Sequence, residues 1–115
     1  MSDRTERLLG RLPAADVDLM VVSDLFNVRY LTGYTGSNGL VLVGPEQRAF
    51  LTDFRYTEQA AAEVDPSYER HTVSLDLLEA IVDLVGAVNG ASPPRLGFEQ
   101  VQRDRVALEI GRAHV

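Results

Sequence analysis

Residues 39–52 read GLVLVGPEQRAFLT, two largely apolar runs that are separated by a short polar turn. The tetrapeptide at 44–47, Gly-Pro-Glu-Gln, has turn chemistry, because proline presets the backbone angle needed at the first central position of a β-turn. The flanking runs, 39–43 and 48–52, each have the length of a short strand. We therefore predict an antiparallel β-hairpin over this stretch.

Strand and helix signals alternate on both sides of the hairpin. Before it, residues 17–23 (VDLMVVS) form an apolar run typical of a strand that is covered on both faces. The other expected elements are helices at 3–12, 25–32, 55–64, 75–89 and from 101, and strands at 68–73 and 95–99. Alternation of this kind around one hairpin indicates a single α/β domain with a mixed sheet.

Several residues are expected to mark the ends of these helices. Asp24 and Asp53 precede two of them and can cap their first turns, while Gly33 can adopt the left-handed conformation that ends a helix. Ser74 is the expected cap of the helix at 75–89. The predicted apolar stripe of that helix consists of Leu78, Ile81, Val82 and Val85.

Composition excludes several classes of protein. The chain has 115 residues, 45% of them hydrophobic, which is ordinary for a folded domain and excludes a disordered one. A formal charge of −6 without a basic run argues against nucleic acid or an anionic membrane as a partner. The charged N-terminus does not resemble a signal peptide, and no apolar run reaches the ~18 residues of a membrane span. We expect a cytoplasmic protein.

The sequence offers no complete catalytic or metal-binding set. It has no cysteine, and its two histidines, His71 and His114, are not accompanied by further ligands in a recognisable motif. Ser37 lies outside a nucleophile motif. Gly33, Gly36 and Gly39 do not have phosphate-loop spacing, so we interpret them as glycines that permit tight turns. No catalytic residue, metal site or cofactor is expected within this chain.

The polar segment 52–56 (TDFRY) has the most chemical potential, because it lies where a strand ends and a helix begins. Ligands of open α/β sheets gather at such strand ends. Arg55 could bind a carboxylate through two hydrogen bonds, with Tyr56 beside it. In the alternative interpretation Asp53 caps the helix, Arg55 pairs with an acid and Tyr56 packs on the sheet. Sequence physics favours this second, structural interpretation.

Residues 26–60 resemble the amino-terminal domain of the Xaa-Pro peptidase, prolidase and creatinase family. The matching features, in chain order, are Asn27, Tyr30-Leu31-Thr32-Gly33, Gly36-Ser37, the strand Leu40 to Val43, Leu51-Thr52-Asp53, Arg55-Tyr56, Gln59-Ala60 and, later, Leu96-Gly97-Phe98-Glu99. The resemblance extends over roughly Arg4 to Leu108. It implies a three-layer αβα domain with a mixed, mostly five-stranded sheet containing one antiparallel hairpin, a ribonuclease H-like motif.

In this family the domain, here residues 1–108, precedes a larger catalytic domain. The resemblance implies that the catalytic domain binds two divalent metal ions (Mn, Co or Zn) through Asp, Asp, His, Glu and Glu, and hydrolyses the peptide bond before proline. None of those ligands can be assigned here. By itself, the 115-residue chain is therefore expected to be inactive, a fragment of a metal-dependent aminopeptidase or dipeptidase.

The resemblance also implies a role for the amino-terminal domain. It would support a homodimer of the full-length protein and cap the active site, where proline-containing peptides bind. The candidate substrate-binding residues are Asn27, Tyr34, Arg55 and Tyr56. Two alternatives remain open: the same domain from a creatinase-like C–N hydrolase, and a stand-alone binding module without enzymatic activity.

We interpret the last residues of the chain as having a non-native origin. Ile110 to Val115 reads IGRAHV, and ATC GGA AGA GCA CAC GTC, a stretch of a widely used sequencing adapter, translates to the same six residues. We therefore expect residues 109–115 to be a non-native tail.

Overall fold

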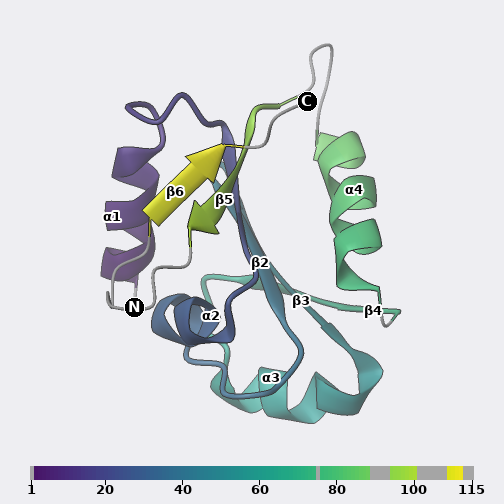
Figure 1. The fold of residues 1–115 in the computed structure, drawn as a ribbon. Helices are drawn as coiled ribbons and strands as arrows, with labels where there is room; N and C mark the ends of the chain where they lie inside the picture. The colour runs from purple at the N-terminus through teal and green to yellow at the C-terminus, as the bar shows by residue number, and fades with distance from the viewer. Residues whose placement is uncertain (1, 75, 89–93, 101–108, 113–115) are drawn as a thin grey trace.

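Six strands form one mixed sheet with helices on both faces in the computed structural model, which describes residues 2–74, 76–88, 94–100 and 109–112 (Figure 1). The strands are β1 (Leu19–Val22), β2 (Leu40–Gly44), β3 (Gln47–Asp53), β4 (Glu69–Val73), β5 (Leu96–Gln100) and β6 (Glu109–Arg112). The helices are α1 (Ser2–Arg11), α2 (Leu25–Thr32), the 3₁₀ turn η1 (Phe54–Tyr56), α3 (Thr57–Glu63) and α4 (Leu77–Val88).

The sheet has the strand order β4-β3-β2-β1-β5-β6. Strands β1, β3, β4 and β5 are parallel to one another, whereas β2 and β6 run in the opposite direction. The expected hairpin is present: Gly44 pairs with Gln47 at the turn, and Leu40 pairs with Leu51 at the open end. The predicted α/β fold with a mixed sheet is confirmed, and β6 adds a sixth strand to the five that were expected.

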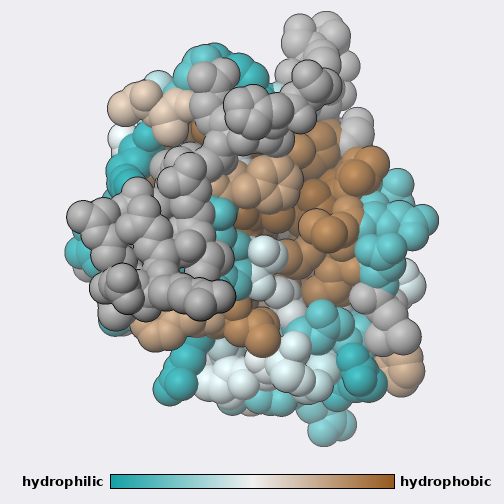
Figure 2. Space-filling view, viewed as in Figure 1, coloured by the Kyte–Doolittle hydropathy of each residue, from teal (hydrophilic) through white to brown (hydrophobic). Residues whose placement is uncertain are grey.

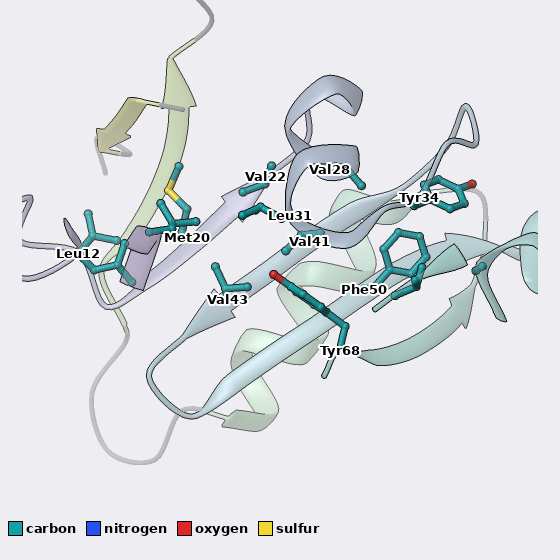
Figure 3. Packing of buried hydrophobic residues seen from close by; sticks show 14 residues of the cluster. Leu12, Met20, Val22, Val28, Leu31, Tyr34, Val41, Val43, Phe50 and Tyr68 are labelled. Carbon is teal, nitrogen blue, oxygen red and sulfur yellow. The ribbon is translucent and has the colours of Figure 1, made fainter. Parts of the chain in front are cut away.

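Two apolar cores lie on opposite faces of the sheet, because successive side chains of a strand point to opposite sides. On one face, alternate residues of β1 to β3 pack against α1, α2 and α3. Figure 3 shows the buried side chains of this cluster from close by. On the other face, the intervening residues pack against α4. The central strands are thus covered on both sides. This arrangement gives the three αβα layers, which are visible in Figure 1.

The ends of α2 follow the predicted signals. The Asp24 side chain accepts a hydrogen bond from the Phe26 amide (2.9 Å), and Gly33 ends the helix in the left-handed conformation, with φ of 86°. For α4 the expected cap at Ser74 is wrong. The helix begins at Leu77, and the Asp76 carboxylate accepts from the Glu79 amide at 3.1 Å. Either side chain is chemically able to cap a helix, so sequence chemistry alone did not distinguish them.

The apolar stripe expected on α4 is partly wrong. Among the residues of this helix whose side chains the structure describes, Leu77 and Ile81 are buried, whereas Leu78 and Val82 are 58% and 69% exposed. Periodicity identified an apolar side but did not show which part of it would meet the sheet. As a result, apolar surface extends over α4 and the neighbouring sheet face (Figure 2).

The prediction of a helix that begins at Val101 is wrong for the end of that segment. Glu109 and Ile110 lie in β6, where Ile110 pairs with Glu99 of β5. Strand pairing along the edge of β5 replaces the helical conformation there. The earlier residues of that expected helix, 101–108, lie outside the described residues. Among the helices that the structure describes, none is long and apolar enough to cross a membrane.

Candidate functional site

The predicted site residues lie in two networks near the ends of β1 and β3. Tyr34, Arg55 and Tyr56 meet around the loop at 33–39, which joins α2 to β2. Asn27, on α2, belongs to a different network that is built around Glu99 of β5. The structure therefore brings three of the four residues together.

Tyr34 forms the centre of the first network. Its side chain is 1% exposed, and its ring packs edge-on against Phe50 with a centroid distance of 4.7 Å. The Tyr34 hydroxyl donates to the Asn38 carbonyl oxygen at 3.0 Å and lies 3.3 Å from the Thr52 hydroxyl. Burial raises the pKa of this phenol, which keeps it a neutral donor. In this arrangement Tyr34 positions the loop and exposes almost no surface to a ligand.

Two glycines allow the loop to wrap around Tyr34. A Cβ atom on Gly36 would lie 2.1 Å from the Tyr34 hydroxyl oxygen, and one on Gly39 would lie 2.9 Å from the ring. Neither glycine has a positive φ; of the described glycines only Gly33 does. The interpretation of these residues as turn glycines thus holds for Gly33, while Gly36 and Gly39 are needed for close packing.

A buried carboxylate connects this loop to the end of β3. Asp53 has a fully buried side chain and accepts two hydrogen bonds from the Arg55 guanidinium, at 2.8 Å (Nε) and 2.9 Å (Nη2). It also accepts from the Arg55 amide at 2.9 Å and from the Asn38 side-chain amide at 2.5 Å. The Arg55 guanidinium holds the pKa of Asp53 far below its ordinary value, with help from Asn38 and against the effect of burial. Asp53 caps η1 and Arg55 pairs with an acid, as the structural interpretation of this segment predicted.

The outer side of this network is open to solvent. The Arg55 side chain is 55% exposed, and its Cζ atom lies 5.3 Å from the centre of the Tyr56 ring. The half-buried Tyr56 places its hydroxyl 2.5 Å from that of Ser37. Phe54, between Asp53 and Arg55, is 72% exposed. The end of β3 therefore presents a cation, two hydroxyls and an aromatic ring.

Glu63 at the end of α3 holds the other end of the loop. Its carboxylate accepts from the Thr35 amide at 2.8 Å and from the Thr35 hydroxyl at 2.9 Å, while Gln59 donates to it at 3.3 Å. These hydrogen bonds, led by the one from the Thr35 amide, lower the pKa of Glu63. The loop is therefore fixed by carboxylates at both ends.

We expect the two carboxylates to make the fold sensitive to acid. Their pKa values lie below the ordinary values of 3.8 for Asp53 and 4.5 for Glu63, so the unfolded chain takes up protons first as the pH falls. Their contribution to stability is present above those ordinary values and is lost below them. Thermal unfolding followed by circular dichroism should show a falling Tm below about pH 4.5. Glu63→Gln should reduce the dependence on pH, and a wild-type Tm that stays constant down to pH 3 would contradict this account.

Asn27 takes part in a clamp between α2 and β5. Its side-chain amide donates to Glu99 Oε2 at 2.9 Å, while Glu99 Oε1 accepts from the Asp24 amide at 2.7 Å and the Ser23 hydroxyl at 2.9 Å. Glu99 thereby satisfies amide groups at the start of α2 that the helix itself cannot. In this arrangement Asn27 orients a carboxylate within the domain.

Sequence reasoning missed three polar residues of these networks as site residues: Ser37, Asn38 and Glu99. The sequence context of Ser37 raised only the question of a nucleophile, whereas in the structure its hydroxyl pairs with that of Tyr56. Asn38 and Glu99 bind partners that are 15 and 72 positions away in the sequence. A signal for Ser37 and Asn38 was their position between two glycines beside a strand, and Glu99 was part of the late strand pattern.

A hollow of about 450 Å³ adjoins the loop on the α4 side. Its apolar lining comes from Leu25, Leu40, Leu77 and Leu78, and its polar lining from Ser23, Ser37, Asn38 and Asp76, with Gly39 between them. It lies past the end of β1, between the first turns of α2 and α4. Ser37 and Asn38 therefore belong both to the hollow and to the network of Arg55 and Tyr56.

Within the described ranges, no group of three or more His, Cys, Asp or Glu side chains is placed to hold a metal ion. The carboxylates of the site are instead occupied by protein donors: Asp53 by Arg55 and Asn38, and Glu63 by Thr35. These two carboxylates thus do not fit a metal centre.

Comparison with known proteins identifies the family of the domain. A family model described as "Creatinase/Prolidase N-terminal domain" matches residues 4–108. The chain belongs to this family. The resemblance deduced from residues 26–60 is confirmed, and the fold deduced from it agrees with that of solved relatives.

The solved relatives include isolated domains and longer chains. The N-terminal domain of the cytoplasmic peptidase PepQ from Mycobacterium tuberculosis H37Rv is 36% identical, with a TM-score of 0.70, and the match covers 88% of this chain and 77% of that one. The Xaa-Pro dipeptidase from Bacillus anthracis is 27% identical, with a TM-score of 0.76 over 89% of this chain and 28% of that one. Such relatives are Xaa-Pro aminopeptidases and dipeptidases.

A curated relative shows how much of a longer protein this domain represents. The uncharacterized peptidase YqhT of Bacillus subtilis (strain 168) is 39% identical over 98 residues, which are 85% of this chain. The match spans only 26% of the length of YqhT.

Proposed function

We propose that this chain is the non-catalytic N-terminal domain of a Xaa-Pro peptidase of the aminopeptidase P or prolidase type. The observation that carries the proposal is the family match over residues 4–108, in a chain that spans about a quarter of its curated relative. Hydrolysis before proline, with two divalent metal ions, would belong to the remaining part of the full-length protein. Residues 1–108 would form the domain, and 109–115 would be a non-native tail.

Within the full-length protein, the domain would cap the active site with the loop at 33–39 and the end of β3. The exposure of Arg55 and Phe54 supports this assignment, because both side chains present surface that a neighbouring part of the protein or a substrate could contact. Arg55 and Tyr56 would contact the peptide directly. Tyr34 and Asn27 would act through the loop and helix that they position. A cap of this kind excludes water and strengthens polar contacts in the closed site.

The proposal also covers the oligomeric state, the binding partners and the cellular location of the full-length protein. An apolar surface lies over α4, where Leu78 and Val82 are exposed (Figure 2). This surface supports the proposal of a homodimer, in which it would be covered by another part of the assembly. A formal charge of −6 argues against nucleic acid and anionic membranes as partners. A cytoplasmic location is supported by the relative that is named a cytoplasmic peptidase.

Arg55→Ala in the full-length protein tests the capping role. We expect kcat/KM for a Xaa-Pro peptide to fall about tenfold, the equivalent of about 1.4 kcal/mol of transition-state binding. Arg70→Ala is the matched control, since Arg70 is an exposed arginine on β4. Both variants are assayed well below their Tm, so that a loss of stability is separated from a loss of turnover. Unchanged peptide kinetics in Arg55→Ala would refute a substrate-facing role for Arg55.

A further inference from the structure

Arg55 keeps one edge of its guanidinium free. Asp53 occupies Nε and Nη2, and Nη1 has no partner among the residues that the structure describes. A carboxylate ligand cannot take the inner edge, because the buried Asp53 already fills it. The Nη1–Nη2 end remains, in a side chain that is 55% exposed. That end offers two parallel N–H donors, the geometry that a carboxylate accepts.

A free hydroxyl donor lies beside this network. Ser37 and Tyr56 share one hydrogen bond of 2.5 Å, in which one hydroxyl donates to the other. The accepting hydroxyl therefore retains its own hydrogen for a further acceptor. Ser37 is exposed, so a ligand can reach this pair from the solvent.

The hollow supplies an apolar surface next to the same donors. Ser37 and Asn38 line it, and Asn38 also binds the carboxylate that holds Arg55. Its four leucines would bury an aliphatic side chain. The site thus combines a position for an anion with a position for an apolar group, joined by two loop residues.

We propose that this site binds the C-terminal residue of a peptide. The terminal carboxylate would lie on the Nη1–Nη2 end of Arg55 within reach of the Ser37–Tyr56 pair, and an aliphatic side chain would enter the hollow. Asp53 already balances part of the arginine charge, which favours a singly charged carboxylate over a phosphate. The inference rests on the proposed function and specifies which end of the substrate the domain recognises.

The test is an NMR titration of the 115-residue chain with acetyl-Pro-Leu and with its C-terminal amide. We expect the acid to shift the amide resonances of Ser37 and Asn38 and the Nε–H resonance of Arg55, with a Kd about fivefold lower than that of the amide. Arg55→Lys, which keeps a positive charge near Asp53, should remove the preference for the acid. Arg70→Lys should retain it.

Leu78→Ser tests the hollow separately, because Leu78 is exposed and its replacement leaves the core intact. It should weaken the acid and the amide equally. Equal Kd values of the two peptides for the wild-type chain, or a preference that survives in Arg55→Lys, would overturn the proposal. The titration involves no turnover. If the titration shows no preference for the acid but Arg55→Ala lowers kcat/KM in the full-length protein, the binding proposal is overturned and the proposed capping function is still supported.

Discussion

Gly36→Val is expected to lower the free energy of unfolding by about 3 kcal/mol, near the upper end of the usual cost of overpacking. The new Cβ atom would lie 2.1 Å from the Tyr34 hydroxyl oxygen and 2.2 Å from the ring carbon that bears it. The ring cannot turn aside easily, because it is buried against Phe50 and its hydroxyl is bound to Asn38. Urea unfolding of the variant and the wild-type chain measures the difference.

Gly10→Ala is the matched control for this substitution. Gly10 lies within α1, and a Cβ atom there would meet nothing within 4 Å. Alanine should therefore raise the free energy of unfolding by up to about 1 kcal/mol, because it is the better helix former. If Gly36→Val left stability within about 0.5 kcal/mol of wild type, the range of an ordinary surface substitution, the close packing of the loop on Tyr34 would be refuted.

Tyr34→Ala should cost about 4 kcal/mol, as is usual when a large aromatic side chain is removed from a core. The substitution removes the edge-on contacts with Phe50 and Tyr56, at centroid distances of 4.7 Å and 6.3 Å, and leaves a cavity beneath the loop. Tyr34→Phe keeps the ring and removes only the hydroxyl, so it should cost about 1 kcal/mol. Urea unfolding of both variants separates the ring from its hydrogen bonds. Equal losses in the two variants would contradict the packing role of the ring.

The two sites should not be independent. Once Tyr34 is alanine, the ring that Gly36→Val would strike is gone, so the valine should then cost at least about 1 kcal/mol less than in the wild-type chain. A double-mutant cycle measures this coupling. Additive losses would mean that the cost at Gly36 has another origin. A coupling free energy of about 1 kcal/mol or more would show that Tyr34 positions the loop that carries Ser37 and Asn38.

Local chemistry predicted much of the fold. The turn at Pro45, the cap at Asp24 and the left-handed Gly33 each depend on residues within a few positions of one another, so short patterns were sufficient. The orientation of α4 on the sheet could not be predicted from short sequence patterns in the same way. Its sequence shows an apolar side, but the sheet buries Leu77 and leaves Leu78 exposed, and this depends on how the helix docks.

The candidate site shows the same division between local and distant contacts. The pairing of Asp53 with Arg55 spans two positions and was foreseen as one of two interpretations. The contact between Asn38 and Asp53 joins two segments that only the folded sheet brings together. The burial of Tyr34 was not predicted either, because a tyrosine in a glycine-rich loop has the sequence context of an exposed residue.

The most direct test of the account is to read the source gene through the codon for Leu108 and beyond. We expect the native frame to depart there from the IGRAHV tail and to continue into a second domain that carries Asp, Asp, His, Glu and Glu in that order. Assays on Xaa-Pro peptides with added Mn²⁺ would then follow. A native transcript that encodes IGRAHV in frame and then stops would contradict it, and a stand-alone binding domain would become the better account of this chain.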